Sequence, residues 1–133
     1  MKLNIEHPSE LRALFAAIRE AKFSSSPLED VALMTSPFLA DVSHRIGELV
    51  LLEEEKLHGK EQAQEAWTRW SSLTPERREW KMAYDFASNA FLSKWPQWTQ
   101  EEKEQNCRYL FSPFRATQEM LTVFVNQLDA KLE

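Results

Sequence analysis

The fold is decided by residues 36–59, which read SPFLADVSHRIGELVLLEEEKLHG. Ser36 before Pro37 is a helix-start signal, because a serine hydroxyl caps the first turn and the fixed φ of proline suits the first helical position. Gly59 is a stop signal, since glycine tolerates the left-handed conformation in which many helices end. Between them lies the most apolar run of the chain, residues 49–52. We therefore predict a long central helix from Pro37 whose middle is buried by several neighbours.

The helical phase of this stretch predicts which of its residues face the core. That inward set comprises Phe38, Leu39, Val42, Ile46, Leu49, Val50 and Leu57. The apolar phase then runs on past Gly59 through Ala63, Ala66, Trp67 and Trp70. Both a break at Gly59 and a kinked continuous helix fit this pattern, and we favour the break.

Glycine and proline set the fold class. The 133 residues include two glycines and six prolines. β-Hairpins rely on glycine for turns with positive φ, so its scarcity argues against a sheet. Four prolines follow Ser or Thr, and each pair is read as a helix start: Ser26-Pro27, Ser36-Pro37, Thr74-Pro75 and Ser112-Pro113. We predict an all-α, single-domain bundle of five to seven helices over residues 1–133, with the long helix from Pro37 at its centre.

Apolar residues spaced three and four apart place the other helices. They predict a first helix over about 8–22, a helix from Thr74-Pro75 that ends at Trp95-Pro96, and a last helix from Ser112-Pro113. Capping boxes at 26–29 and 99–102 predict two short helices. The sequence Ser-Pro-Phe-x-Ala occurs at both 36–40 and 112–116. This repeat is compatible with a duplicated helical unit, although a shared helix-start signal is the simpler interpretation.

Composition limits the class of protein. With 43% hydrophobic and 28% charged residues, the chain is typical of a globular domain. A formal net charge of −5 argues against direct nucleic-acid binding, which needs a basic patch. We find neither an apolar run near the roughly 20 residues that span a bilayer nor the apolar region of a signal peptide. Because Cys107 is the one cysteine, no intramolecular disulfide is expected, and we predict a cytoplasmic protein without membrane contact.

Residues 38–44, Phe-Leu-Ala-Asp-Val-Ser-His, resemble the phospho-accepting histidine box of sensor histidine kinases. The resemblance implies a phosphorelay role, with His44 as the phosphoryl carrier. The sequence then departs from the family pattern, since Arg45 stands where the family has an acidic residue and no Thr-Pro follows. If His44 is not a phosphoryl carrier, the helical phase places it near the edge of the core.

A metal- or ligand-binding bundle is the leading alternative function. Glu55 and His58 have the Glu-x-x-His spacing of di-iron carboxylate bundles, and Glu48 lies one turn beyond His44. His44 and His58 are separated by about 20 Å along one helix, however, so they do not share a site within one chain. A solvated acidic helix end is the simpler interpretation.

Catalysis finds little support in the sequence. Cys107 lies on an apolar face, where a free cysteine is usually an inert hydrophobe. Neither a Gly-x-Ser-x-Gly elbow nor a His-Glu-x-x-His motif occurs. We predict no enzyme activity and no cofactor.

Aromatic and acidic residues suggest a surface that binds a protein. The chain holds five tryptophans, and an exposed tryptophan is a plausible anchor for a partner. The candidate contact residues are Trp98, Trp95, Trp70, Glu53, Glu54 and Glu55. We predict a small acidic protein-interaction module, a regulator or inhibitor of a more basic protein partner. A homodimer stays open, because a second chain can cover an apolar helix.

Overall fold

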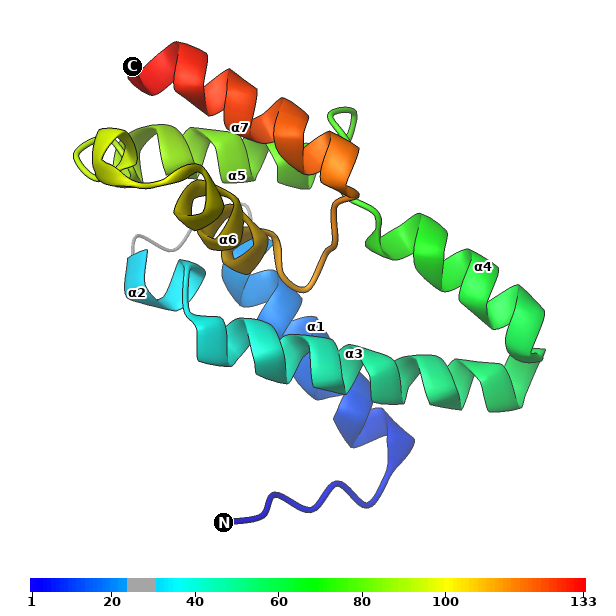
Figure 1. Cartoon of the computed structure of the whole chain (residues 1–133). Coiled ribbons are helices and arrows are strands. Elements are labelled where there is room, and N and C mark those ends of the chain that lie inside the picture. The colour runs from blue at the N-terminus through cyan, green and yellow to red at the C-terminus, as the bar shows by residue number, and fades with distance from the viewer. Residues whose placement is uncertain (24–30) are drawn as a thin grey trace.

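The computed structural model describes residues 1–23 and 31–133. These residues form seven α-helices, a 3₁₀ turn and no strand, so the predicted all-α bundle is confirmed (Figure 1). The elements are α1 (Pro8–Phe23), α2 (Val31–Met34), α3 (Pro37–His58), α4 (Lys60–Ser71), α5 (Arg78–Ala90), η1 (Trp95–Gln97), α6 (Gln100–Phe111) and α7 (Gln118–Leu132).

Helix α3 begins and ends where the sequence predicts. The Ser36 hydroxyl accepts a hydrogen bond from the Leu39 N–H, and Pro37 occupies the first helical position. Gly59 adopts a φ of 87°, so the chain turns there and α4 runs back from the end of α3 (Figure 1). The predicted break at Gly59 is confirmed, because α3 ends at His58 and α4 begins at Lys60. Glycine suits this position, since a residue with a side chain would be strained at this φ.

The C-terminal cluster is the larger of two hydrophobic cores. Helices α5, α6 and α7 pack on one another around side chains that are wholly removed from solvent, such as Leu110, Phe111, Leu121 and Phe124. Thr99 and Thr117 cap α6 and α7 by accepting hydrogen bonds from backbone N–H groups of their first turns. The helical phase of residues 80–91 predicts an apolar stripe of Trp80, Ala83, Tyr84, Ala87 and Phe91; all are buried except Tyr84, which is half-buried.

The N-terminal cluster joins α1, α3 and α4 around Leu11, Phe15, Ile18, Ile46 and Val50. Gly47 allows α4 to approach α3 closely, because a Cβ there would lie 3.1 Å from the Trp67 ring and 3.2 Å from the Phe15 ring. Each core residue of this cluster keeps 6–8% of its surface exposed. The cluster is therefore less completely enclosed than the C-terminal one.

Trp70 and Lys22 join the two clusters. The Trp70 ring centroid lies 5.5 Å from that of Phe15 in the N-terminal cluster and 5.0 Å from that of Phe114 in the C-terminal cluster. Lys22 is 1% exposed, and its Nζ donates to the Tyr109 carbonyl and to Ser112 Oγ, both at 2.7 Å. Desolvation by burial lowers the pKa of Lys22 to about 7.

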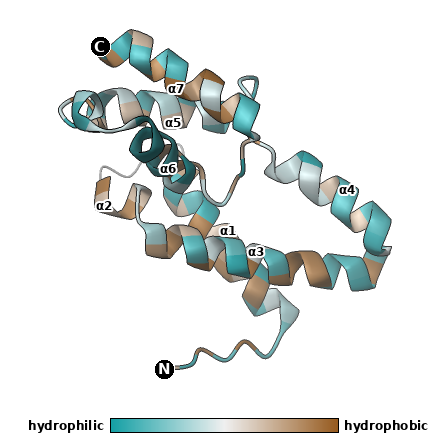
Figure 2. Cartoon of the chain, viewed as in Figure 1, coloured by the Kyte–Doolittle hydropathy of each residue, from teal (hydrophilic) through white to brown (hydrophobic). Residues whose placement is uncertain are grey.

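The predicted burial of the middle of α3 is wrong. Leu49 and Leu52 are 48% and 50% exposed, and Phe38 and Leu57 are more exposed still. Figure 2 shows that hydrophobic residues recur along α3 between hydrophilic ones. The side that carries Ala40, Ile46, Gly47 and Val50 is buried, and within the described residues the opposite side stays largely exposed. Of the predicted inward set, Ile46 and Val50 are buried, while Leu39 and Val42 are half-buried.

Two of the predicted helix starts are misplaced. Thr74-Pro75 lies in a turn, and α5 begins only at Arg78; Ser112-Pro113 lies in a loop with a cis peptide bond, and α7 begins at Gln118. Both segments are instead connections between helices, and they lie side by side: the Leu73 N–H donates a hydrogen bond to the Arg115 carbonyl at 2.8 Å. The two Ser-Pro-Phe-x-Ala segments thus differ in structure. The predicted capping box at 26–29 lies outside the described residues.

Candidate functional site

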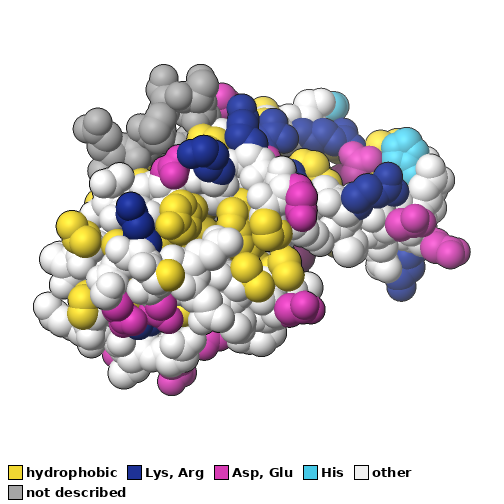
Figure 3. Space-filling view, turned by 90° about the horizontal axis from the view of Figure 1, so that it is seen from above, with side chains coloured by type: hydrophobic (Ala, Val, Ile, Leu, Met, Phe, Trp, Pro, Cys, Tyr) yellow, Lys and Arg dark blue, Asp and Glu magenta, His cyan; other side chains and the backbone are white. Residues whose placement is uncertain are grey.

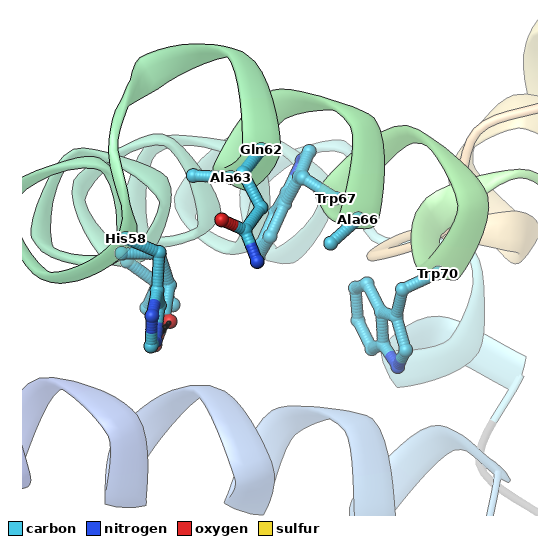
Figure 4. A pocket seen from close by; sticks show the side chains of 8 residues that line it. His58, Gln62, Ala63, Ala66, Trp67 and Trp70 are labelled. Atoms are coloured by element: carbon cyan, nitrogen blue, oxygen red, sulfur yellow. Dashed lines mark ion pairs between the residues drawn. The ribbon is translucent and has the colours of Figure 1, made fainter.

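A groove of about 400 Å³ lies beside α4, with α3 forming its floor and α1 facing it. Figure 4 shows Gln62, Trp67 and Trp70 extending from α4 toward this space, and His58 at one end of it. The lining side chains come from α3 and α4: Val50, Glu54, His58, Gln62, Ala63, Ala66, Trp67 and Trp70.

The apolar wall of the groove follows from the helical phase of α4. Ala63, Ala66, Trp67 and Trp70 are three or four residues apart and therefore share one side of the helix. The Trp67 and Trp70 ring centroids lie 5.3 Å apart, and the Phe15 ring packs within 6 Å of both. Both tryptophans are only half-buried, so part of each indole faces the groove.

The other end of the groove is polar. Glu54 Oε1 accepts a hydrogen bond from Arg12 at 2.9 Å, and Glu54 Oε2 lies 3.4 Å from His58 Nε2. The Glu54 side chain keeps about a third of its surface exposed, at 32%. A carboxylate accepts several hydrogen bonds, so Glu54 can receive a further cationic donor from outside.

The groove brings together two of the six predicted contact residues, Trp70 and Glu54. Glu53 and Glu55 do not line the groove and are bound within the chain. Glu53 accepts from Lys56, and Glu55 accepts from Gln64 across the α3–α4 turn, both at 3.0 Å.

Trp95 and Trp98 lie in the C-terminal cluster and not at the groove. The expectation that Trp95 lies at the surface is wrong, because it is fully buried. Its Nε1 donates to Asp129 Oδ1 at 2.8 Å, and Lys103 Nζ lies 5.0 Å from its ring centroid. Trp98 is half-buried, with its ring centroid 5.1 Å from that of Phe91. Both indoles therefore pack beneath the segment between α5 and α6.

The four residues of the metal alternative are not brought together. Among the described residues, no group of three or more His, Cys, Asp or Glu side chains is placed to hold a metal ion. Glu55 turns toward Gln64 and His58 toward Glu54, while Glu48 lines a small cavity beside His44. That cavity measures about 40 Å³ and is bordered by Arg115.

His44 lies in cationic surroundings. Desolvation by burial, followed by the charges of Arg115 and Lys22, lowers the pKa of His44 to about 4 against a small opposing effect of Asp41. The adjacent cavity is large enough for water but not for a phosphoryl donor. The geometry gives the phosphorelay alternative no support.

Cys107 is buried among apolar side chains, as the sequence predicts. Desolvation raises the pKa of its thiol far above the ordinary value, so the group stays protonated and unreactive.

The sequence interpretation missed Trp67 and Lys22. Trp67 is absent from the predicted contact residues, although its spacing of three from Trp70 places both on one side of α4. Lys22 continues the phase of Leu11, Phe15 and Ile18 on α1, which is the signal that could have predicted its burial.

The outer surface differs between the two parts of the molecule. Seen from above, apolar side chains gather over the broader part, which holds α5 and α7, while charged side chains and histidine surround the narrower part (Figure 3). In the part of the chain that the structure describes, every helix is too short or too polar to cross a membrane.

Comparison of the chain with protein-family models, with curated proteins and with solved structures finds no match.

Proposed function

We propose that this chain is a small acidic protein-interaction module that binds an amphipathic segment of a partner protein in the groove between α3 and α4. It acts as a regulator or inhibitor of that partner and not as a catalyst. The observation that carries this proposal is the combination, in one groove, of the partly exposed Trp67 and Trp70 rings with the Glu54 carboxylate. Its buried lone cysteine suits the reducing cytoplasm, the compartment that we propose.

The groove defines the chemistry of the bound segment. An apolar side chain would pack on the Trp67 and Trp70 rings, where burial of aromatic surface contributes most to affinity. A lysine or arginine would pair with Glu54, and the formal charge of −5 would speed the approach of a basic partner. Val50 and Glu54 are one helical turn apart, so the apolar and basic groups of the segment should be about one to two turns apart.

A polypeptide fits the groove better than a small molecule does. Its volume lies within the range of small-molecule pockets, but such pockets enclose most of the ligand surface. This groove is lined by side chains of α3 and α4 and is only partly enclosed. A helix laid in an open groove keeps its polar face in water, as in known helix-in-groove recognition.

Selection of random peptides displayed on phage against the immobilised chain tests the proposal. We expect enriched sequences to combine an apolar or aromatic residue with Lys or Arg one to two helical turns away. Ala66→Arg fills the groove from an exposed position on α4 and should abolish binding of these peptides. Thr68→Arg, exposed on another side of α4, is the matched control and should leave binding unchanged. Glu54→Gln should weaken it roughly threefold to tenfold, as expected for a partly exposed ion pair.

Two results would refute the proposal. One is that no peptide is enriched over background. The other is that the enriched peptides bind Ala66→Arg as tightly as they bind the unmodified chain.

A further inference from the structure

The face of α3 that points away from the groove carries an unpartnered stripe of side chains. Phe38, Leu49 and Leu52 are 82%, 48% and 50% exposed. Together with Arg45 and Lys56 they form what we call the outer stripe: Phe38, Arg45, Leu49, Leu52 and Lys56. Among the described residues, these apolar side chains therefore keep about half of their surface or more exposed to solvent.

The outer stripe has the spacing of a helix that pairs with another helix. From Arg45 onward its members are separated by four, three and four residues, and Phe38 lies seven before Arg45. Spacings that alternate between three and four residues keep side chains on one line facing a parallel or antiparallel partner helix. The stripe is about 27 Å long at 1.5 Å per residue.

A shallow recess lies beside the stripe. It measures about 320 Å³, and its lining includes Ile5, Leu11, Leu49 and Leu52, with Glu53 and Lys56 at its polar edge. The recess is bordered on its other side by the segment that precedes α1. It therefore offers an apolar seat for a leucine side chain from a facing helix.

The charges along this face are arranged symmetrically about Leu49. Arg45 lies four residues before Leu49 and Glu53 four residues after it; Asp41 lies eight before and Lys56 seven after. Within one chain, Arg45 pairs with Asp41 at 3.1 Å and Lys56 with Glu53 at 3.0 Å. All four lie on or beside the stripe, and Arg45, Asp41 and Lys56 keep 68–71% of their side-chain surface exposed.

We propose that the outer stripe is a homodimer interface, in which α3 packs antiparallel against α3 of a second copy with the two-fold axis near Leu49. In that arrangement Leu49 meets its own counterpart, and each basic side chain faces an acidic one. Arg45 lies opposite Glu53, and Asp41 lies opposite Lys56 of the other copy. A second copy fits better than an unrelated protein because the stripe is complementary to itself in the antiparallel direction. The groove on the opposite side of α3 stays free for the proposed protein partner.

Sedimentation equilibrium of the full chain over a range from about 5 to 500 µM tests the interface. We expect a mass that rises from 15.6 kDa toward twice that value. Leu49→Asp should leave a monomer, because it places two carboxylates at the axis. Arg45→Glu and Glu53→Arg should each weaken the dimer about tenfold or more, because each creates two like-charge contacts.

Mixing the last two variants gives the sharpest result. In a mixed dimer, one contact pairs Glu at 45 with Arg at 53, and the other keeps the original Arg45 and Glu53. An equimolar mixture should therefore dimerise as the unmodified chain does, although neither variant does so alone. Arg69→Glu is the matched control: Arg69 is in the same four-residue ion-pair geometry with Glu65, but on α4, and its change should have no effect. Circular dichroism checks that each variant is folded.

Each contrary outcome overturns the proposal. A monomer at every concentration removes the dimer. A dimer that persists in Leu49→Asp places the interface elsewhere. Failure of the mixture to recover the dimer excludes the antiparallel pairing of Arg45 with Glu53.

Discussion

The two hydrophobic clusters differ in how completely they are closed. In the C-terminal cluster, Phe111 and Phe124 are fully buried, and α5, α6 and α7 enclose them from all sides. In the N-terminal cluster, Phe15 keeps 7% exposure, and a groove lined by α3 and α4 lies beside the cluster. We expect the closed cluster to contribute more to stability, and both binding surfaces that we propose lie on α3, at the less enclosed N-terminal cluster.

The two buried lysines differ in how their charges are compensated. Lys103, in the C-terminal cluster, donates to Asp129 and Glu133, both at 2.9 Å, so its charge is compensated. Lys22, at the boundary between the clusters, is bound by two neutral oxygens. A buried charge is costly without an opposite one, so the boundary contains a group whose charge state matters for folding.

Large-to-small substitutions in the two clusters should give the largest difference. Phe124 lies with its ring centroid 4.7 Å from Phe111 and 5.1 Å from Trp80, so Phe124→Ala leaves an enclosed cavity. We expect a loss of about 4–5 kcal/mol in the free energy of unfolding. Phe15→Ala borders the groove, where solvent can enter, and should cost about 3 kcal/mol or less. Urea denaturation measures both, and equal losses would contradict the contrast.

Trp70→Ala tests how the clusters are joined. Because Trp70 packs on Phe15, Trp67 and Phe114, its truncation should cost about 3 kcal/mol and separate the two clusters into distinct transitions. Trp98→Ala is the matched control, since Trp98 contacts only Phe91 and Trp95 among its described ring partners. Unfolding followed by both circular dichroism and fluorescence distinguishes one transition from two. A single coincident transition in Trp70→Ala would show that the clusters do not depend on this side chain for their coupling.

The stability of the protein should rise between pH 7 and pH 9 because of Lys22. Its pKa is about 7 when folded and near 10.5 when unfolded, so the unfolded state binds more protons in this range. The expected slope is at most about 1.4 kcal/mol per pH unit, or about 2 kcal/mol over the interval. His44 does not interfere, because its transitions lie between about pH 4 and its ordinary value of 6.5. Above pH 9 the Cys107 thiol reduces the gain in stability, because its pKa is raised by burial and it therefore ionises in the unfolded state but not in the folded one.

Lys22→Met should remove this pH dependence, whereas Lys81→Met on the exposed face of α5 should keep it. Urea midpoints at pH 7, 8 and 9 give the measurement. A Lys22→Met variant with the slope of the unmodified chain would assign the dependence to another group.

The sequence predicted those features that depend on neighbouring residues. Ser36, Gly59 and Thr99 act through backbone groups within four residues, so the helix ends that they set were predicted correctly. Thr74-Pro75 and Ser112-Pro113 failed because the same pair also suits a turn, and Arg77 and Thr117 a few residues later precede the actual helices.

Features set by distant residues were not predicted. Leu49 and Val50 are equally apolar, and only the positions of α1 and α4 decide that one is exposed and the other buried. The burial of Trp95 also depends on a distant residue, since its indole donates a hydrogen bond to Asp129, which is 34 residues away. Two of the eight residues that line the groove, Trp70 and Glu54, were among the predicted contacts.

The indole N–H signals of the five tryptophans test the central claim most directly. They distinguish the groove, with Trp67 and Trp70, from the C-terminal cluster, where Trp80 donates to Gln127 and Trp95 to Asp129. A ¹⁵N-labelled sample is titrated with a peptide enriched in the phage selection, and the signals are assigned by single Trp→Phe substitutions. We predict that the Trp67 and Trp70 signals shift and that those of Trp80 and Trp95 stay in place. Shifts at Trp80, Trp95 or Trp98 with the groove pair unchanged would contradict the account.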